Sequence, residues 1–217
     1  MRVSAQPVEI RMAGDEDLLA CLALDDSYTT AYTWQVEVVR GEVSAMPFNV
    51  NLNSNIVLGD TPVSITFRPV KLPRARKVLG PVASALKDGS ESAGMARLQA
   101  WKAADLVLVA EQTGVLCGYL VLTVVPGTGI GWISSLAVAI SMRRKGIGSM
   151  LMAAARRWAR YGHGSAANVR ALMLEVPIKN YPAVAFCRKE GFSLCGYTDY
   201  SFNNEDVVFL FASPVVI

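Results

Sequence analysis

A basic, glycine-bearing stretch in the second half of the chain has the residue types and spacing of an anion-binding turn. It runs from Arg143 to Ser149 and reads Arg-Arg-Lys-Gly-Ile-Gly-Ser. It lies between a predicted strand and a predicted helix. The first backbone N–H groups of a helix have no partner within the helix and lie at the positive end of its dipole. We therefore expect the amides from Arg144 to Ser149 to converge on a phosphate, with two glycines leaving space and three cations adding charge.

Two other interpretations fit the same residues. A solvated basic loop that caps an amphipathic helix would need no ligand, and local features leave this interpretation open. A dinucleotide-binding Rossmann turn would require a third glycine where this chain has Leu151. That turn also belongs in an opening strand–helix–strand unit rather than late in a chain, so the sequence disfavours it.

Hydrophobic patterning predicts the elements that must position this turn. Residues 130–138 predict the strand before it and 146–161 the helix after it, with Ile147, Leu151, Ala154 and Trp158 on one helical face. Arginines 156, 157 and 160 lie off that face and are expected to be solvated. Other strands are predicted at 8–11, 28–40, 62–71, 106–110, 115–125 and 170–176, with two more after residue 190 around a turn at Asn203-Asn204. Other helices are predicted at 15–24, 92–104 and 181–190, an aperiodic loop at 41–60, and loop or short helix at 73–90. This order predicts an α/β chain of the α+β type, with helices on the faces of a mixed sheet.

Length and composition exclude several classes of protein. The 217 residues fit one domain with a full core, 1–217, and a net charge of +3 gives no global attraction to nucleic acid. Four cysteines without a Cys-x-x-Cys pair, and a single histidine, argue against a zinc site, and we expect no metal. The cysteines lie in apolar runs, which favours a reducing, cytoplasmic setting. Neither a signal peptide nor an apolar run of about 20 residues is evident, so we expect no membrane association.

Two motifs in order resemble those of the GNAT superfamily of N-acetyltransferases. The first is Arg143-x-x-Gly146-x-Gly148, which matches the acetyl-CoA signature of that family. The second is a block with the family's "LxV…NxxAxxxYxxxGF" pattern: Leu174-Glu-Val, Asn180-x-x-Ala183 and Phe186-Cys-Arg-Lys-Glu-Gly-Phe. The resemblance is clear over about residues 105–213 and weaker over the first hundred. It implies a GNAT fold, with a central, mostly antiparallel sheet whose fourth and fifth core strands splay apart between flanking helices.

The resemblance also implies acetyl-CoA as the acetyl donor and assigns its contacts. The backbone of Leu136, Ala137 and Val138 should pair with the pantetheine arm, and the Val138 amide should donate to the thioester oxygen. The pyrophosphate should lie on the turn formed by Arg143, Arg144, Lys145, Gly146, Ile147, Gly148 and Ser149. Asn180 matches a family asparagine near the pantetheine, and it also suits a helix N-cap.

The residues that would transfer protons match the family pattern less closely than the cofactor-binding residues do. Glu175 matches a glutamate that some relatives use as general base, although a structural role fits it equally well. Cys187 stands where many relatives have the tyrosine that protonates the CoA thiolate. It is expected either to donate that proton or simply to pack beneath its helix, in which case water or a phenol such as Tyr197 or Tyr200 would be the acid.

The expected reaction is direct acetyl transfer from CoA to a primary amine, with an acyl-Cys187 route as the mechanistic alternative. The run from Leu24 to Thr30 and the later Gly196-Tyr197-x-Asp199 resemble streptothricin acetyltransferases. That resemblance suggests a small-molecule amine attracted by Asp25, Asp26 and Asp199. Alternatives are a protein N-terminus or lysine as acceptor, and an inactive CoA-binding regulatory module. Residues 28–90 are expected to be a family-variable arm, and a wall at the acceptor side would favour a small molecule over a peptide. A homodimer is also compatible with the sequence.

Overall fold

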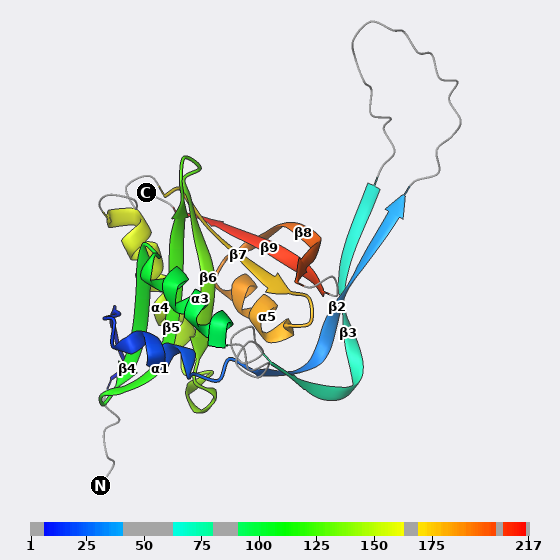
Figure 1. Ribbon diagram of the computed structural model, residues 1–217. Helices are drawn as coiled ribbons and strands as arrows, with labels where there is room; N and C mark the ends of the chain where they lie inside the picture. Colours follow the sequence, from blue (N-terminus) through cyan, green and yellow to red (C-terminus); the bar gives the residue numbers. More distant parts are fainter. Residues whose placement is uncertain (1–6, 41–62, 80–90, 163–168, 203–205, 216–217) are drawn as a thin grey trace, which may run out of the picture.

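A seven-stranded sheet forms the body of the protein (Figure 1). The computed structural model describes residues 7–40, 63–79, 91–162, 169–202 and 206–215. In spatial order the strands are β1 (Glu9–Met12), β4 (Leu106–Gln112), β5 (Val115–Val125), β6 (Ile130–Val138), β7 (Ala171–Pro177), β9 (Asp206–Pro214) and β8 (Ser193–Phe202). The pairing of β6 with β7 is parallel, and every other neighbouring pair in this sheet is antiparallel. This arrangement confirms the predicted mixed, mostly antiparallel sheet.

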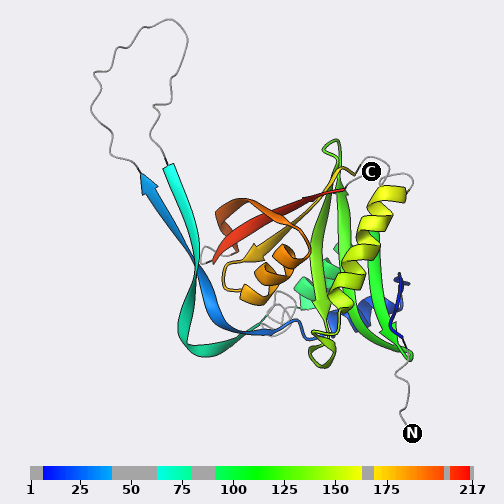
Figure 2. The same cartoon turned by 180° about the vertical axis from the view of Figure 1, so that it is seen from behind.

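Helices cover both faces of the sheet (Figures 1 and 2). On one face lie α4 (Ile147–Tyr161) and α5 (Tyr181–Lys189), and on the other α1 (Asp17–Leu22) and α3 (Glu91–Lys102). A hydrophobic core lies on each face of the sheet, and strand β5 contributes to both cores because its side chains alternate between the faces. Leu120 and Leu122 pack in the core under α4, whereas Tyr119 and Val121 pack in the core under α1 and α3. Each fully buried leucine stabilises the fold by about 1.5–3 kcal/mol.

Strands β6 and β7 separate partway along their length. They pair only from Ile130–Ile133 against Ala171–Leu174 in the described part of the sheet. Beyond that point β6 continues against β5 as far as Val138, and β7 continues against β9 as far as Pro177. A register shift in the β5–β6 ladder skips Ser134, so a β-bulge lies where the two strands part. The predicted splay of the fourth and fifth core strands is therefore the gap between β6 and β7.

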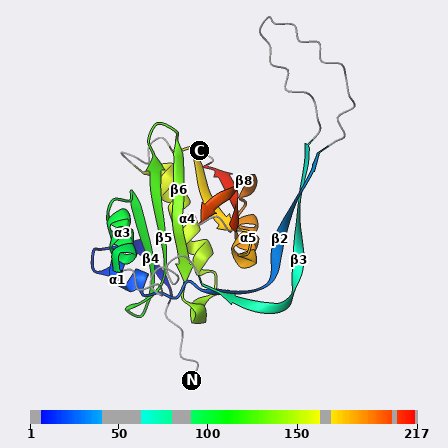
Figure 3. The same ribbon diagram turned by 45° about the vertical axis from the view of Figure 1, so that its right-hand side comes forward.

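A long two-stranded ribbon extends from the body (Figure 3). It pairs β2 (Tyr28–Arg40) with β3 (Val63–Val78) in antiparallel register. The prediction of loop or short helix from residue 73 was wrong for 73–78, because β3 continues past Pro73. A register shift opposite Thr30–Tyr32 absorbs the proline, and a ribbon without a third strand tolerates a missing N–H. The predicted loop over 41–60 and the rest of 80–90 lie outside the described residues.

The part of the ribbon around Trp34 and Phe67 is held against the body by backbone and aromatic contacts. The Trp34 amide donates to the carbonyl of Ile178 at 3.2 Å, next to the start of α5. Phe67 meets Phe209 edge-on with ring centroids 5.1 Å apart, and Trp34 stacks over Tyr181 at 6.0 Å. Aromatic pairs of this kind add about 0.5–1.5 kcal/mol each beyond burial, so this part of the ribbon packs firmly on the body.

One predicted solvated side chain on α4 is instead half-buried. Arg156 donates to the carbonyl of Glu190 at 2.6 Å and lies over the Phe192 ring at 5.1 Å. The prediction failed because the end of α5 packs on this side of α4, a contact that helical periodicity cannot show. No described helix is long and apolar enough to cross a membrane.

Candidate active site

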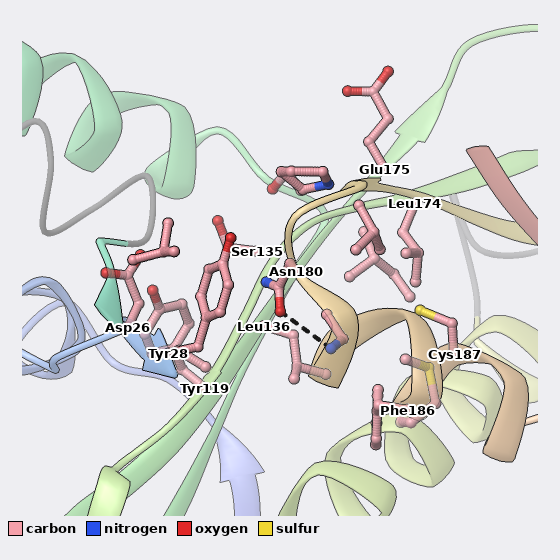
Figure 4. Close-up of a pocket in the computed structure, with 18 of the residues that line it drawn as sticks. Asp26, Tyr28, Tyr119, Ser135, Leu136, Leu174, Glu175, Asn180, Phe186 and Cys187 are labelled. Carbon is pink, nitrogen blue, oxygen red and sulfur yellow. Dashed lines mark hydrogen bonds between the residues drawn. The ribbon is translucent and has the colours of Figure 1, made fainter. Parts of the chain in front are cut away.

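A cavity of about 340 Å³ lies at the gap between β6 and β7 (Figure 4). Part of its lining belongs to the α4 and α5 side: Met152, Leu174, Val176, Ala183, Phe186 and Cys187. A second part belongs to the α1 and α3 side: Asp26, Arg97 and Tyr119. A third part is the ribbon root, which consists of Tyr28, Val78 and Leu79. The separating strands and the loop after β7 supply the remainder: residues 133–137, Glu175, Pro177 and Asn180. Since its walls come from both faces, the cavity passes through the sheet.

Backbone groups of β6 point into this gap. The Ala139 amide donates to the Cys117 carbonyl at 2.9 Å, so the pair at 117 and 139 is a hydrogen-bonded pair of the β5–β6 ladder. Hydrogen-bonding direction alternates along an antiparallel strand, so the amides and carbonyls of Leu136 and Val138 face away from β5. In agreement, the Val138 carbonyl accepts a hydrogen bond from Arg143 instead. An extended ligand in the gap would meet a strand edge at Leu136 and Val138.

The turn before α4 leaves helix amides without a capping side chain. The first backbone bond of the helix runs from Met150 to the carbonyl of Gly146 at 3.0 Å, and no side chain caps this end among the described residues. The amides of residues 147–149 therefore lack an intrahelical acceptor. Gly146 has φ +89°, and a Cβ there would project into open space. The turn suits a phosphate in both charge and space.

The other predicted turn residues have specific packing roles. Gly148 lies against α5, because a Cβ at this position would approach the Phe186 ring to 3.2 Å. The packing of α4 against α5 therefore favours glycine at this position. The Ser149 hydroxyl donates to the Glu190 carboxylate at 2.6 Å, which ties α4 to the end of α5. Arg144 and Lys145 are exposed beside the turn.

Arg143 connects the turn to the segment before the ribbon. Its Nε donates to the Val138 carbonyl at 2.8 Å, and its two terminal nitrogens donate to the carbonyls of Ser27 at 2.6 Å and Asp25 at 3.1 Å. These three bonds use donors of the guanidinium and direct it away from the first amides of α4. The side chain therefore positions the segment that brings Asp26 and Tyr28 into the cavity.

We expect Arg143→Gln to lower the free energy of unfolding by about 1–3 kcal/mol, because three carbonyls lose a charged donor. Amide hydrogen exchange at residues 25–28 should accelerate at the same time. Arg144→Gln, on the exposed neighbour, is the control and should stay within about 0.5 kcal/mol. Equal effects of the two substitutions in chemical denaturation would show that the three bonds add nothing.

Glu175 lies in the gap on the side opposite Cys187. Side chains alternate along β7, with Leu174 and Val176 buried towards α4 and α5 and Glu175 half-buried on the other face. In Figure 4 its carboxylate extends away from Cys187 and Phe186. Burial raises the pKa of the Glu175 carboxyl above its ordinary value. A carboxylate with a raised pKa at a cavity wall is suited to accept a proton near neutral pH.

Cys187 lines the cavity but is only 2% exposed. Burial raises the pKa of its thiol to about 12. The thiol is therefore protonated at neutral pH and is a poor nucleophile, since the thiolate is the reactive form. It is also a poor proton donor to a thiolate of ordinary pKa, about 8.5 for cysteine.

We expect Cys187→Ala to keep kcat for amine acetylation within about 3-fold of the wild type, because an inert buried thiol contributes packing alone. Steady-state kinetics measures this, and mass spectrometry after incubation with acetyl-CoA alone should find no acetyl adduct. An adduct that disappears in Cys187→Ala, together with a large loss of kcat, would instead establish an acyl-enzyme route.

The tyrosines that line the cavity are not Tyr197, which was predicted as a proton donor. Tyr197 packs edge-on against Phe67 of the ribbon at 6.0 Å and is not among the cavity-lining residues. Tyr28 and Tyr119 line the cavity instead, and Figure 4 shows them beside Asp26. Burial raises the pKa of the Tyr119 phenol, so it stays protonated. Sequence reasoning missed Tyr119 because it lies in an apolar strand and has the pattern of a core residue.

Asn180 and some of the predicted acidic residues line the cavity, whereas Asp25 has partners elsewhere. The Asn180 side chain accepts from the Ala183 amide at 3.1 Å, which confirms the N-cap, and the residue also lines the cavity. Asp26 lines the cavity, whereas the Asp25 carboxylate turns to the Ser27 amide at 2.8 Å and to Lys77 at 3.8 Å. The side chains of Asp199 and Tyr200 lie outside the described residues. Of the predicted acids, Glu175 and Asp26 share the cavity.

The fold and the site define an acetyltransferase: the sheet splits around a cavity, and α4 begins at a turn without a capping side chain among the described residues. The chain belongs to the acetyltransferase (GNAT) family, whose family model matches residues 82–192, and it is an enzyme of that family. A search of curated protein sequences returned no match.

Solved structures show the same fold over nearly the whole chain. A nourseothricin acetyltransferase is 21% identical, with a TM-score of 0.69, covering 96% of this chain and 99% of that one. A Bacillus anthracis str. Ames protein assigned as a streptothricin acetyltransferase, solved with acetyl coenzyme A, is 18% identical, with a TM-score of 0.62 and coverage of 97% and 99%. A ribosomal-protein alanine N-acetyltransferase from Escherichia coli is 14% identical, with a TM-score of 0.54 and coverage of 97% and 96%. These relatives include enzymes named for small-molecule and for protein acceptors.

Proposed function

We propose that this enzyme transfers an acetyl group from acetyl-CoA directly to the primary amine of a small molecule. The observation that carries this proposal is the cavity through the sheet. It joins the edge of β6, where the Leu136 and Val138 amides face away from β5, to a walled space lined by Asp26 and Glu175. The backbone of Leu136 and Val138 would hold the pantetheine arm of acetyl-CoA. The amides after Gly146 would bind its pyrophosphate.

The remaining residues would promote the transfer itself. Glu175 takes the proton of the ammonium, and the nitrogen lone pair then forms a bond to the thioester carbon. The carbon–sulfur bond breaks with its electron pair on the sulfur of CoA, which is protonated by water or by a cavity phenol. The Val138 amide donates to the thioester oxygen as negative charge develops there, a contact worth a few kcal/mol of barrier. Holding both reactants in one cavity supplies much of the remaining acceleration.

The ribbon root favours a small acceptor over a protein segment. Tyr28 of β2 and Val78 and Leu79 at the end of β3 form part of the cavity wall on the α1 and α3 side. A wall at this position restricts the length of an acceptor that can enter. A protein N-terminus or lysine is the second candidate, because a relative with the same fold is named for a protein acceptor.

Calorimetric titration of acetyl-CoA into the full chain, followed by thiol release with a panel of small amines, tests the proposal. Micromolar binding and release of CoA with at least one small amine would support it. Binding without turnover of any small amine would favour a protein acceptor or a CoA-binding regulatory module, which a peptide panel separates. If the folded chain does not bind acetyl-CoA, the proposed function is wrong.

A further inference from the structure

The cavity contains a guanidinium as well as carboxylates. Arg97 of α3 lines it together with Asp26 and Glu175. Arg97 is half-buried, and it forms no hydrogen bond or ion pair with any other residue that the structure describes. The other arginine near the cavity, Arg143, is already bound to three carbonyls. Among the described residues that line the cavity, Arg97 therefore offers a guanidinium that is available to an anion.

Arg97 and Asp26 both act on the same phenol. The negative charge of Asp26 raises the pKa of Tyr119 and the positive charge of Arg97 lowers it, after the larger effect of burial. Asp26, Arg97 and Tyr119 all line the cavity on the α1 and α3 side of the gap. Glu175 is on the same face and belongs to β7, one of the two separating strands.

A guanidinium at this position would favour some acceptor amines over others according to the charge of their other groups. A polycationic acceptor would bring a second ammonium towards Arg97 in a partly desolvated space, where like charges repel strongly. A carboxylate on the acceptor would instead match the planar fork of the guanidinium, which binds carboxylates through two parallel hydrogen bonds. The ammonium of the same molecule would then lie towards Glu175 and Asp26.

We propose that the acceptor is a small amine that also carries a carboxylate, and that Arg97 binds this carboxylate as the specificity-determining residue. The inference rests on the proposed acetyl transfer. A cavity of about 340 Å³ holds a molecule of amino-acid size beside an acetyl group, at the lower end of the usual range of 300–1,000 Å³ for ligand pockets.

Matched pairs of acceptors that differ only in the carboxylate test this proposal: L-lysine against cadaverine, L-phenylalanine against phenethylamine, and β-alanine against ethylamine. The wild type should show a kcat/KM about 10- to 100-fold higher for the carboxylate member of at least one pair, as expected for hydrogen bonds to a charged group. Arg97→Met should abolish this preference, because it should lower kcat/KM far more for the carboxylate member than for the plain amine. Arg97→Lys should keep part of it, and Arg157→Met, on the exposed face of α4, should keep all of it.

Three outcomes would overturn this proposal about the acceptor. The first is a wild-type enzyme that does not prefer the carboxylate member in any pair. The second is an Arg97→Met variant that melts at the wild-type temperature and keeps the wild-type preference for the carboxylate member. Acetyl-CoA binding without turnover of any carboxylate member also overturns it. Failure of acetyl-CoA to bind is a different result, because it rejects the proposed function itself.

Discussion

Gly146→Glu is expected to weaken acetyl-CoA binding by roughly 100-fold or more, since it places a carboxylate where the pyrophosphate should lie. The amides of residues 147–149 are the anion donors of this site, and the open space over Gly146 is where the new side chain would project. Calorimetry with acetyl-CoA measures the change directly. Desulfo-CoA, which retains the pyrophosphate, should lose affinity to the same extent.

A second glycine provides a matched control for this substitution. Gly127, in the turn between β5 and β6, has φ +73° and also has open space around a built Cβ. Gly127→Glu therefore introduces the same backbone strain and the same charge away from the cavity. Both variants should melt at similarly reduced temperatures, but Gly127→Glu should bind acetyl-CoA normally. Wild-type affinity in Gly146→Glu would show that the pyrophosphate does not bind at this turn.

Glu175→Gln is expected to lower kcat/KM for amine acetylation by about 10²- to 10⁴-fold, the range typical for loss of a general base. Because burial raises the pKa of Glu175, the acidic limb of the wild-type pH–rate profile should lie above the ordinary glutamate value of about 4.3. The rate should rise with pH as the carboxyl loses its proton, and the variant should lack this limb. Acetyl-CoA affinity should be unchanged.

Stability separates this catalytic role from a structural one. A carboxyl whose pKa is raised in the folded state opposes folding at pH values above that pKa, and the penalty is relieved as pH falls through it. Glutamine carries no such charge, so Glu175→Gln should be at least as stable as the wild type at neutral pH in thermal melts. Glu9→Gln, on exposed β1, is the control and should change neither rate nor stability. A variant that is active but clearly destabilised would show that Glu175 has a structural role instead.

Local patterns predicted the elements that carry the turn, but not the surroundings of the cavity. The strands 115–125 and 130–138 have the bounds predicted for them, since apolar runs bounded by turns depend on nearby residues. The gap depends on where β6 and β7 stop pairing, and these strands are far apart in the sequence. Tyr119 and Arg97 enter the site through such distant contacts. The spacing of residues in the sequence could not predict the hydrogen bonds from Arg143 to residues 25 and 27 either.

The passage of the cavity through the sheet has a consequence for the order of events during turnover. If acetyl-CoA occupies the gap from the α4 side and the amine reaches it from the α1 side, neither reactant blocks the route of the other. Either can then bind first, and either product can leave first. Initial-rate plots with both substrates varied would give intersecting lines, and CoA would compete with acetyl-CoA but not with the amine. A single inhibitor that spans both routes would have to pass between β6 and β7.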